Sequence, residues 1–340
     1  MIQRWWVIGA VILLAGCGSS NRTGGTTVML KGAGATFPYA LYAKWFDEFH
    51  RIHPNFQIDY QSIGSAGGIR QLLAGAVDFG ASDSPMTYEQ LEQAKLNTLH
   101  FPTVLGAVVP TYNVAEITQE LNFTGEALAG IFAGKIKRWN DPQLVKVNPG
   151  VKLPSSDIAV IHRADSSGTS FVWTDYLSKV SEEWKKTTGA GPSVNWPAGL
   201  GAKGTEGVAA LVKQTPNSIG YVELVYAIQN QLAYGPVRNA SGKFVKADLP
   251  SVTAAAAGVP MPDDFRVSIT NAFGEYAYPV SSFTWLLIPS RIADPGKHQA
   301  IVQFLQWMLA DGQKLAPALN YAPLPAEVVS KETGAVSQIH

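Results

Sequence analysis

A run of small hydroxyl residues that follows an arginine has the composition of an anion-binding loop. The apolar residues 158–161 before it predict a buried strand, and apolar residues spaced i, i+3, i+4, i+7 over 173–180 predict one face of a helix after it. A loop between a strand and a helix start presents free backbone N–H groups and the positive end of the helix dipole, and both favour an anion. The run reads Arg163-Ala164-Asp165-Ser166-Ser167-Gly168-Thr169-Ser170.

Two interpretations of this run are open from its residues alone. In the first, the guanidinium of Arg163 donates to a phosphate or carboxylate and Asp165 holds the arginine in place. In the second, Ser166 or Ser167 caps the helix and binds nothing else.

Three further predicted strands, in the N-terminal part of the chain, also end on small or polar residues. Strands that alternate with helices in this way predict an α/β fold. In open α/β sheets, ligands bind outside the carboxyl ends of the strands, so we expect the four loops to converge on one cleft. Thr36 and Phe37, Ser65, and Asp83 lie at these three strand ends.

Other segments set the framework around these loops. The apolar run 101–109 suits a crossover between two lobes, the segment 283–288 predicts a buried strand, and apolar residues at helical spacing over 301–308 predict a late helix. A helix is predicted to begin at Pro38, because proline is favoured at the first helical position. Residues 240–265 lack periodicity, apart from a short alanine run, and predict loop.

Composition limits the kind of protein and its partners. The 340 residues are enough for two domains or one large domain, and 46% hydrophobic with 15% charged residues predicts a globular chain. The formal net charge is +0, so no overall field attracts nucleic acid or a membrane surface. The six histidines are scattered and there is one cysteine, so neither a metal site nor an internal disulfide is expected.

The N-terminus has the pattern of a lipoprotein signal. Arg4 precedes an apolar run that is too short for a membrane-spanning helix, so residues 1–16 predict a signal peptide. The run ends in Leu-Ala-Gly-Cys, which resembles a bacterial lipobox with Cys17 as the lipidated residue; the alternative is an ordinary signal peptide with a chance cysteine. Residues 17–26 would then be a flexible tether.

A glycine pattern at 199–204 matches the dinucleotide-binding fingerprint, with Glu223 nineteen residues beyond its last glycine. That fingerprint requires a strand directly before it, and the proline- and glycine-containing residues 190–198 do not predict one. No phosphate-binding loop of a nucleotide hydrolase, nucleophile elbow or zinc-protease motif occurs in the sequence. We therefore expect no cofactor and no catalysis.

Seven motifs in this order resemble the PstS family, the phosphate-binding proteins of bacterial phosphate ABC transporters. They run through most of the chain after residue 26 and together are highly specific, although each alone is weak. Serine at 166 and histidine at 162 stand where the family often has glycine and arginine, at positions that do not bind the ligand. The motifs are GAGATFP (32–38), GSAGG (64–68), VDFGASDSP (77–85), GKIKRWNDP (134–142), RADSSGTSF (163–171), WPAGLGAKG (196–204) and SIGYVE (218–223).

The resemblance implies a type II periplasmic binding-protein fold, in which two α/β lobes are joined by two crossover segments and the ligand lies in the cleft. Lobe 1 would be residues 27–104 and 283–340, and lobe 2 residues 105–282. Asp165 would hold the arginine of the site. The implied phosphate-binding residues are Thr36, Phe37, Ser65, Asp83, Arg163, Ser167, Gly168 and Thr169.

The implied function is delivery of inorganic phosphate to an ABC permease in the inner membrane, by a monomer in the periplasm or anchored by lipid at the cell surface. An ionised Asp83 accepts hydrogen bonds only, so it would pair with a P–OH group and repel the oxygens of sulfate. The alternatives are a secreted phosphatase of related fold, a binding protein for another oxyanion, and an adhesion or sensing lipoprotein.

Overall fold

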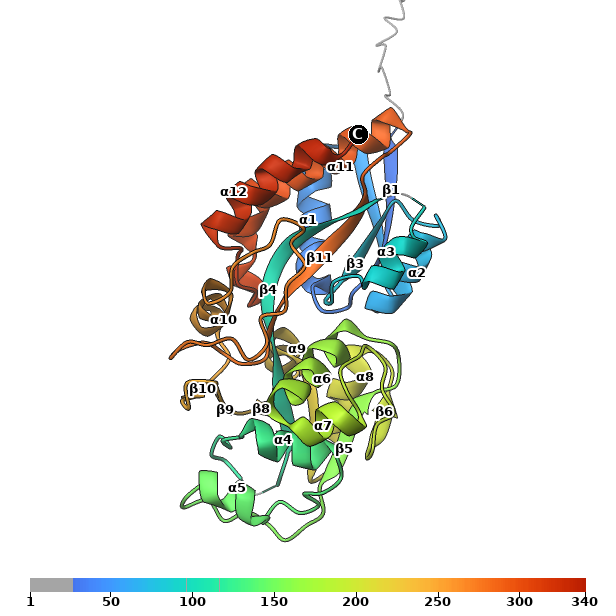
Figure 1. Ribbon diagram of the computed structural model, residues 1–340. Helices are drawn as coiled ribbons and strands as arrows, with labels where there is room; N and C mark the ends of the chain where they lie inside the picture. The colour runs from blue at the N-terminus through green and yellow to red at the C-terminus, as the bar shows by residue number, and fades with distance from the viewer. Residues whose placement is uncertain (1–26, 96, 116) are drawn as a thin grey trace, which may run out of the picture.

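The computed structural model of the protein describes residues 27–95, 97–115 and 117–340. The predicted signal peptide, the tether and Cys17 lie outside these residues. Figure 1 shows two parts, one above the other, and the long strand β4 (Thr98–Asn113) runs from the upper part into the lower.

The upper part is built on a sheet in the order β2-β1-β3-β11-β4. Strand β1 is parallel to β2 and to β3, whereas β11 is antiparallel to β3 and to the first half of β4. The strands are β1 (Val28–Gly34), β2 (Phe56–Ser62), β3 (Phe79–Ser82) and β11 (Ser281–Pro289), and the helices around them in Figure 1 are α1 (Tyr39–Ile52), α2 (Ser65–Leu73), α3 (Tyr88–Gln93), α11 (Pro295–Ala310) and α12 (Ala326–Ala335).

Helix α1 lies where Pro38 predicted a helix. Its aromatic residues Tyr42, Trp45, Phe46 and Phe49 share one face and are buried, and the Trp45 indole donates to the Gly312 carbonyl at 2.7 Å. Pro38 is the N-cap residue and the helix begins at Tyr39, one position after the predicted start. This shift has no effect on which face is buried.

The lower part continues the same sheet from the second half of β4 in the order β4-β7-β5-β6. Strand β7 is antiparallel to β4, and β5 is parallel to both β7 and β6. The elements of this part are β5 (Ala159–Arg163), β6 (Leu200–Ala202), β7 (Ser218–Glu223), β8 (Ala233–Tyr234), α4 (Gly125–Phe132), α5 (Pro142–Val147), α6 (Gly168–Val180), α7 (Glu182–Thr187), α8 (Gly204–Gln214) and α9 (Leu224–Gln229).

The partner of β4 changes between two adjacent residues. Ala107 pairs with Ser281 of β11, and Val108 pairs with Glu223 of β7. One continuous strand therefore belongs to both parts, and the chain returns to the upper part where β11 begins. The predicted lobe boundaries at 104/105 and 282/283 stay a prediction, and they lie close to this change of partner.

The predicted loop at 240–265 is wrong for its centre. Helix α10 (Leu249–Ala257) forms there, and the Asp248 side chain accepts a hydrogen bond from the Ser251 N–H while the Ser251 side chain accepts from the Asp248 N–H. The small hairpin of β9 (Val237–Arg238) and β10 (Phe244–Val245) precedes it. The alanines are good helix formers, but they give little amphipathic periodicity, so a period-based interpretation misses this helix.

Gly34 closes β1 with a backbone conformation that only glycine adopts easily. Its φ is +146°, and a Cβ atom there would lie 2.0 Å from the Ala81 carbonyl oxygen on β3. Gly34→Ala is expected to reduce the free energy of unfolding by about 3 kcal/mol or more, because backbone atoms must move apart. Chemical denaturation measures the loss.

Gly75→Ala is the matched control. Gly75 also has a positive φ, +68°, but nothing lies within 4 Å of the position a Cβ would take. It is expected to cost only about 1 kcal/mol, the cost of the left-handed conformation. An equal loss in both variants would contradict the close approach of β1 and β3.

Candidate functional site

The predicted site residues meet at the junction of the two parts. Thr36 and Phe37 follow β1, Ser65 begins α2 after β2, and Asp83 directly follows β3, all in the upper part. The residues from the lower part lie at the end of β5 and the start of α6. The structure buries all eight: Thr36, Phe37, Ser65, Asp83, Arg163, Ser167, Gly168 and Thr169.

Arg163 is the only cation among these residues and is 2% exposed. Its Nε donates to Asp165 Oδ1 at 2.8 Å, and its Nη2 donates to the other carboxylate oxygen. Its Nη1 donates to Thr205 Oγ1 at 3.0 Å and lies 3.5 Å from Thr169 Oγ1. Burial opposes ionisation of Asp165, but its bonds to Arg163 outweigh this and lower its pKa. The pairing of Asp165 with Arg163 is therefore present.

The start of α6 brings backbone donors to the same place. Ser167 is the N-cap, and its hydroxyl accepts from the Ser170 N–H at 3.3 Å, so the capping role considered from sequence does apply to Ser167. Capping leaves other N–H groups of the first turn without a partner inside the helix. Those of Gly168 and Thr169 are in this first turn and remain suited to an anion.

Asp83 contributes a buried carboxyl group from the opposite side. Its Oδ1 accepts from Thr284 Oγ1 at 2.8 Å, and its Oδ2 accepts from Ser65 Oγ at 3.3 Å. Burial raises its pKa to about 8, and the negative charge of Glu223 adds to this, while the two hydroxyls and Arg163 lower it. Burial thus favours the protonated form of Asp83, whereas the ionised form is expected from the sequence.

The two parts touch at the site. A Cβ atom on Gly168 would lie 2.3 Å from Ser65 Oγ and 2.7 Å from Asp83 Cβ. Thr36 Oγ1 lies 3.3 Å from Thr205 Oγ1, and Tyr226 donates to the Thr36 carbonyl at 3.2 Å. These contacts join the upper and lower parts around the carboxyl ends of β1, β3 and β5.

Four side chains at this junction were not predicted as site residues. Thr205 and Tyr226 come from the first turns of α8 and α9, and Thr284 lies inside the apolar strand β11. Glu223, noted from the sequence only for its distance from the glycine pattern, ends β7, so the rule that placed Asp83 at a strand end would also have found it. Thr284 gave no such signal, because its neighbours predict only burial.

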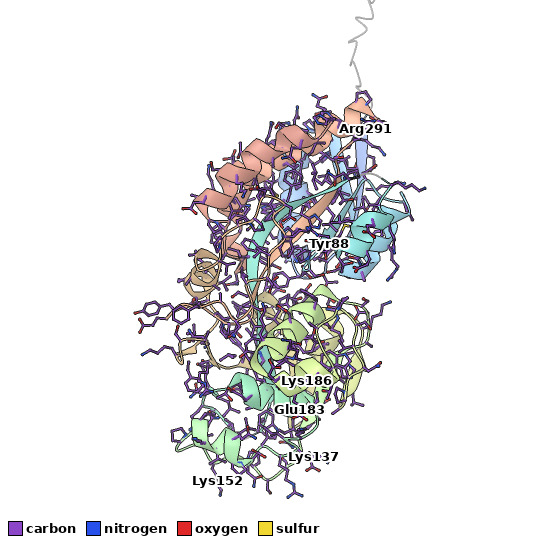
Figure 2. The ribbon with its side chains drawn as sticks, in the orientation of Figure 1. Tyr88, Lys137, Lys152, Glu183, Lys186 and Arg291 are labelled. Carbon is purple, nitrogen blue, oxygen red and sulfur yellow. The ribbon has the colours of Figure 1, made fainter. Side chains whose placement is uncertain are left out.

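Several charged side chains far from the junction lie on the outer surface. Figure 2 labels Lys137, Lys152, Glu183, Lys186 and Arg291, and each is exposed, away from the junction of the two parts. In the part of the chain that the structure describes, no group of three or more His, Cys, Asp or Glu residues is placed to hold a metal ion. None of the described helices has the length and apolar character needed to cross a membrane.

The glycine pattern at 199–204 belongs to this junction through its last residue. Residues 190–198 form no strand, and the pattern itself supplies the short strand β6 and the start of α8. The Gly204 N–H donates to Asp165 Oδ1 at 3.0 Å. The pattern therefore supports the partner of Arg163.

Comparison with known proteins finds a family model, described as a PBP superfamily domain, that matches residues 20–312. A phosphate-binding protein PstS of Pasteurella multocida is 47% identical over 305 residues, which cover 89% of this chain and 88% of that protein. Another, from Xylella fastidiosa (strain Temecula1), is 44% identical over 308 residues, 90% of this chain and 84% of its own.

Solved structures share the fold at low sequence identity. A high-affinity periplasmic phosphate-binding protein, solved with phosphate, has a TM-score of 0.73 at 18% identity and covers 90% of this chain and 93% of its own. A phosphate-binding protein from Stenotrophomonas maltophilia has a TM-score of 0.68 at 18% identity, with the same coverage. The predicted type II periplasmic binding-protein fold is confirmed.

The close approach at Gly168 leads to a prediction about closure. Gly168→Ala would place a methyl group against Ser65 and Asp83, so the two parts are expected to separate and the radius of gyration in small-angle X-ray scattering to increase. Gly207→Ala, inside α8, is the control, because its Cβ would meet only ordinary contacts from 3.6 Å. Identical scattering for wild type and Gly168→Ala would contradict this contact in solution.

Proposed function

The chain belongs to the PstS family of phosphate-binding proteins, and from this membership and the junction just described we propose that it binds inorganic phosphate for an ABC importer. The observation that carries the proposal is the pairing, across one junction, of a buried arginine and a helix N-terminus with a buried carboxyl group. The first two favour an anion, and the third favours an anion that still has a proton.

The donors of the proposed site are mostly neutral. Thr36, Ser65, Ser167 and Thr169 are assigned hydroxyls, and Phe37 and Gly168 backbone N–H groups. The Ser167 N–H already donates to the Pro192 carbonyl at 2.8 Å. The charge of Arg163 is already offset by Asp165. The oxyanion would then be held chiefly by the dipoles of neutral N–H and O–H groups. Arg163 would add a planar guanidinium whose donors match the oxyanion's oxygens.

Selectivity over sulfate is assigned to Asp83. Phosphate near neutral pH keeps at least one proton, whereas sulfate has none. An ionised Asp83 can accept a hydrogen bond from that P–OH group. Against sulfate it would contact an oxygen that is also only an acceptor, and such a contact is costly in a buried site. Since burial and Glu223 raise the pKa of Asp83 to about 8, this assignment requires that Asp83 ionise when phosphate binds.

Closure of the two parts over phosphate would be the signal read by the permease. A ligand that contacts both parts stabilises the closed form by the contacts that exist only there. We assign the protein to the periplasmic side, tethered through lipid on Cys17 and acting as a monomer. Its relatives are binding proteins, and the role proposed here is affinity without catalysis.

The alternatives named from the sequence differ in simple assays. A phosphatase of related fold would release phosphate from a phosphomonoester. A binding protein for another oxyanion would prefer sulfate or molybdate in direct competition. No feature of the junction favours either, and an additional adhesion or sensing role would leave phosphate binding unchanged.

Asp83→Asn tests the proposed function and its specificity together. The amide offers an N–H donor to sulfate, so the preference for phosphate over sulfate is expected to fall by at least about 10²-fold. Calorimetric titration of the mature protein, stripped of ligand, with phosphate and then sulfate measures both affinities.

Asp59→Asn is the matched control, since Asp59 is exposed on β2. It is expected to keep the wild-type preference. Wild-type selectivity in Asp83→Asn would refute the role of Asp83, whereas failure of folded wild type to bind phosphate would refute the proposed function.

A further inference from the structure

A second carboxyl group, Glu223, is buried in the junction and has no role in the site as proposed so far. It ends β7 beside the change of partner in β4, and it is 1% exposed. Its Oε1 accepts from Thr169 Oγ1, while its Oε2 is buried without a hydrogen-bond partner among the described residues. The Thr205 hydroxyl is near enough to favour the ionised form. A buried carboxylate oxygen without a partner is costly, so its proton state needs an explanation.

The hydroxyl of Thr169 shows what Glu223 controls. A threonine hydroxyl has one proton to donate. While Thr169 donates it to an ionised Glu223, and Arg163 Nη1 points at the same hydroxyl from 3.5 Å, the Thr169 hydroxyl has no proton to offer an oxyanion. If Glu223 carries a proton, the bond can reverse, with Glu223 donating to Thr169, and the threonine proton becomes free for the ligand.

Asp83 is affected by the same proton. The negative charge of Glu223 helps to keep Asp83 protonated, and Arg163 favours the ionised form of both carboxyls. The other titratable groups facing Glu223 are Tyr226 of α9 and Tyr321, and burial keeps both neutral by raising their pKa values. Protonation of Glu223 would therefore let Asp83 ionise and accept a hydrogen bond from a P–OH group.

We propose that Glu223 is a positioning residue that holds the proton on which phosphate binding depends. As a carboxylic acid it frees the Thr169 hydroxyl to donate and allows Asp83 to act as the acceptor. The inference rests on the proposed function, because phosphate is the anion whose P–OH group needs this acceptor.

The proton balance gives the sign of the pH dependence. Glu223 and Asp83 interact, so the pair holds its first proton jointly, and burial raises the pKa of both groups, that of Asp83 to about 8. Below that pH the pair already has one proton, which moves to Glu223 when phosphate binds. Above it the pair is fully ionised, and binding must take one proton from solvent. Affinity should then fall by up to about tenfold per pH unit.

Glu223→Gln tests this directly. Its side-chain amide can donate to Thr169 permanently and carries no charge, so its phosphate affinity should stay flat over the range where wild type weakens. Calorimetric titration with phosphate at about pH 9, in buffers of different ionisation enthalpy, counts the protons taken up on binding. We expect about one for wild type and close to none for Glu223→Gln.

Glu332→Gln is the matched control. Glu332 of α12 is also a buried glutamate; neither of its carboxylate oxygens has a hydrogen-bond partner among the described residues, and burial raises its pKa. It should keep the wild-type proton uptake. Equal uptake in wild type and Glu223→Gln, with phosphate bound by both, would overturn this inference alone; a wild type that binds no phosphate would overturn the proposed function as well.

Wild type alone provides a second test in case Glu223→Gln fails to fold. Infrared difference spectra on adding phosphate at about pH 9 should gain the carbonyl band of a protonated carboxylic acid. Binding of phosphate without that band would also overturn the proposal.

Discussion

The buried guanidinium of Arg163 is the constraint around which the junction is arranged. A guanidinium removed from water must have its charge offset and its donors directed at acceptors. Asp165 provides the charge, two residues along the chain, and the Gly204 N–H fixes that carboxylate from α8. The remaining nitrogen, Nη1, is directed at the hydroxyls of Thr205 and Thr169, which lie in the first turns of α8 and α6. Two helix starts are thus tied to one arginine at the end of β5.

This arrangement explains why the site is assembled from strand ends. Strands β1 and β3 in the upper part and β5 and β7 in the lower part direct their carboxyl ends toward the junction, and polar residues can be placed there without interrupting an apolar core. The shared strand β4 keeps the two sets facing each other, because it pairs with β11 through Ala107 and with β7 from Val108. Gly168 of the lower part then lies against Asp83 of the upper part.

The local sequence pattern predicts where strands end and which residues follow them. These predictions were sufficient for most of the fold and for the loops that meet at the junction. The pattern does not predict partners that are set by register. Thr284 reaches Asp83 because antiparallel pairing of β11 with β3 places Trp285 opposite Ser82, and nothing in the apolar sequence around Thr284 indicates this. Helix α10 was missed for a different reason, since its alanine-rich sequence lacks a marked apolar face.

The sequence pattern also cannot predict which carboxyl groups at the junction carry a proton. An aspartate at a strand end was expected to be ionised, because an isolated carboxyl group in water is. Burial raises the pKa of Asp83, the charge of Glu223 raises it further, and the two carboxyls have to be considered as one titrating pair. With a single arginine already paired, a proton on that pair limits the negative charge that an incoming anion meets. If Glu223 directs the Thr169 hydroxyl as proposed, the affinity of the site for an anion depends on the proton that the pair holds, and therefore on pH.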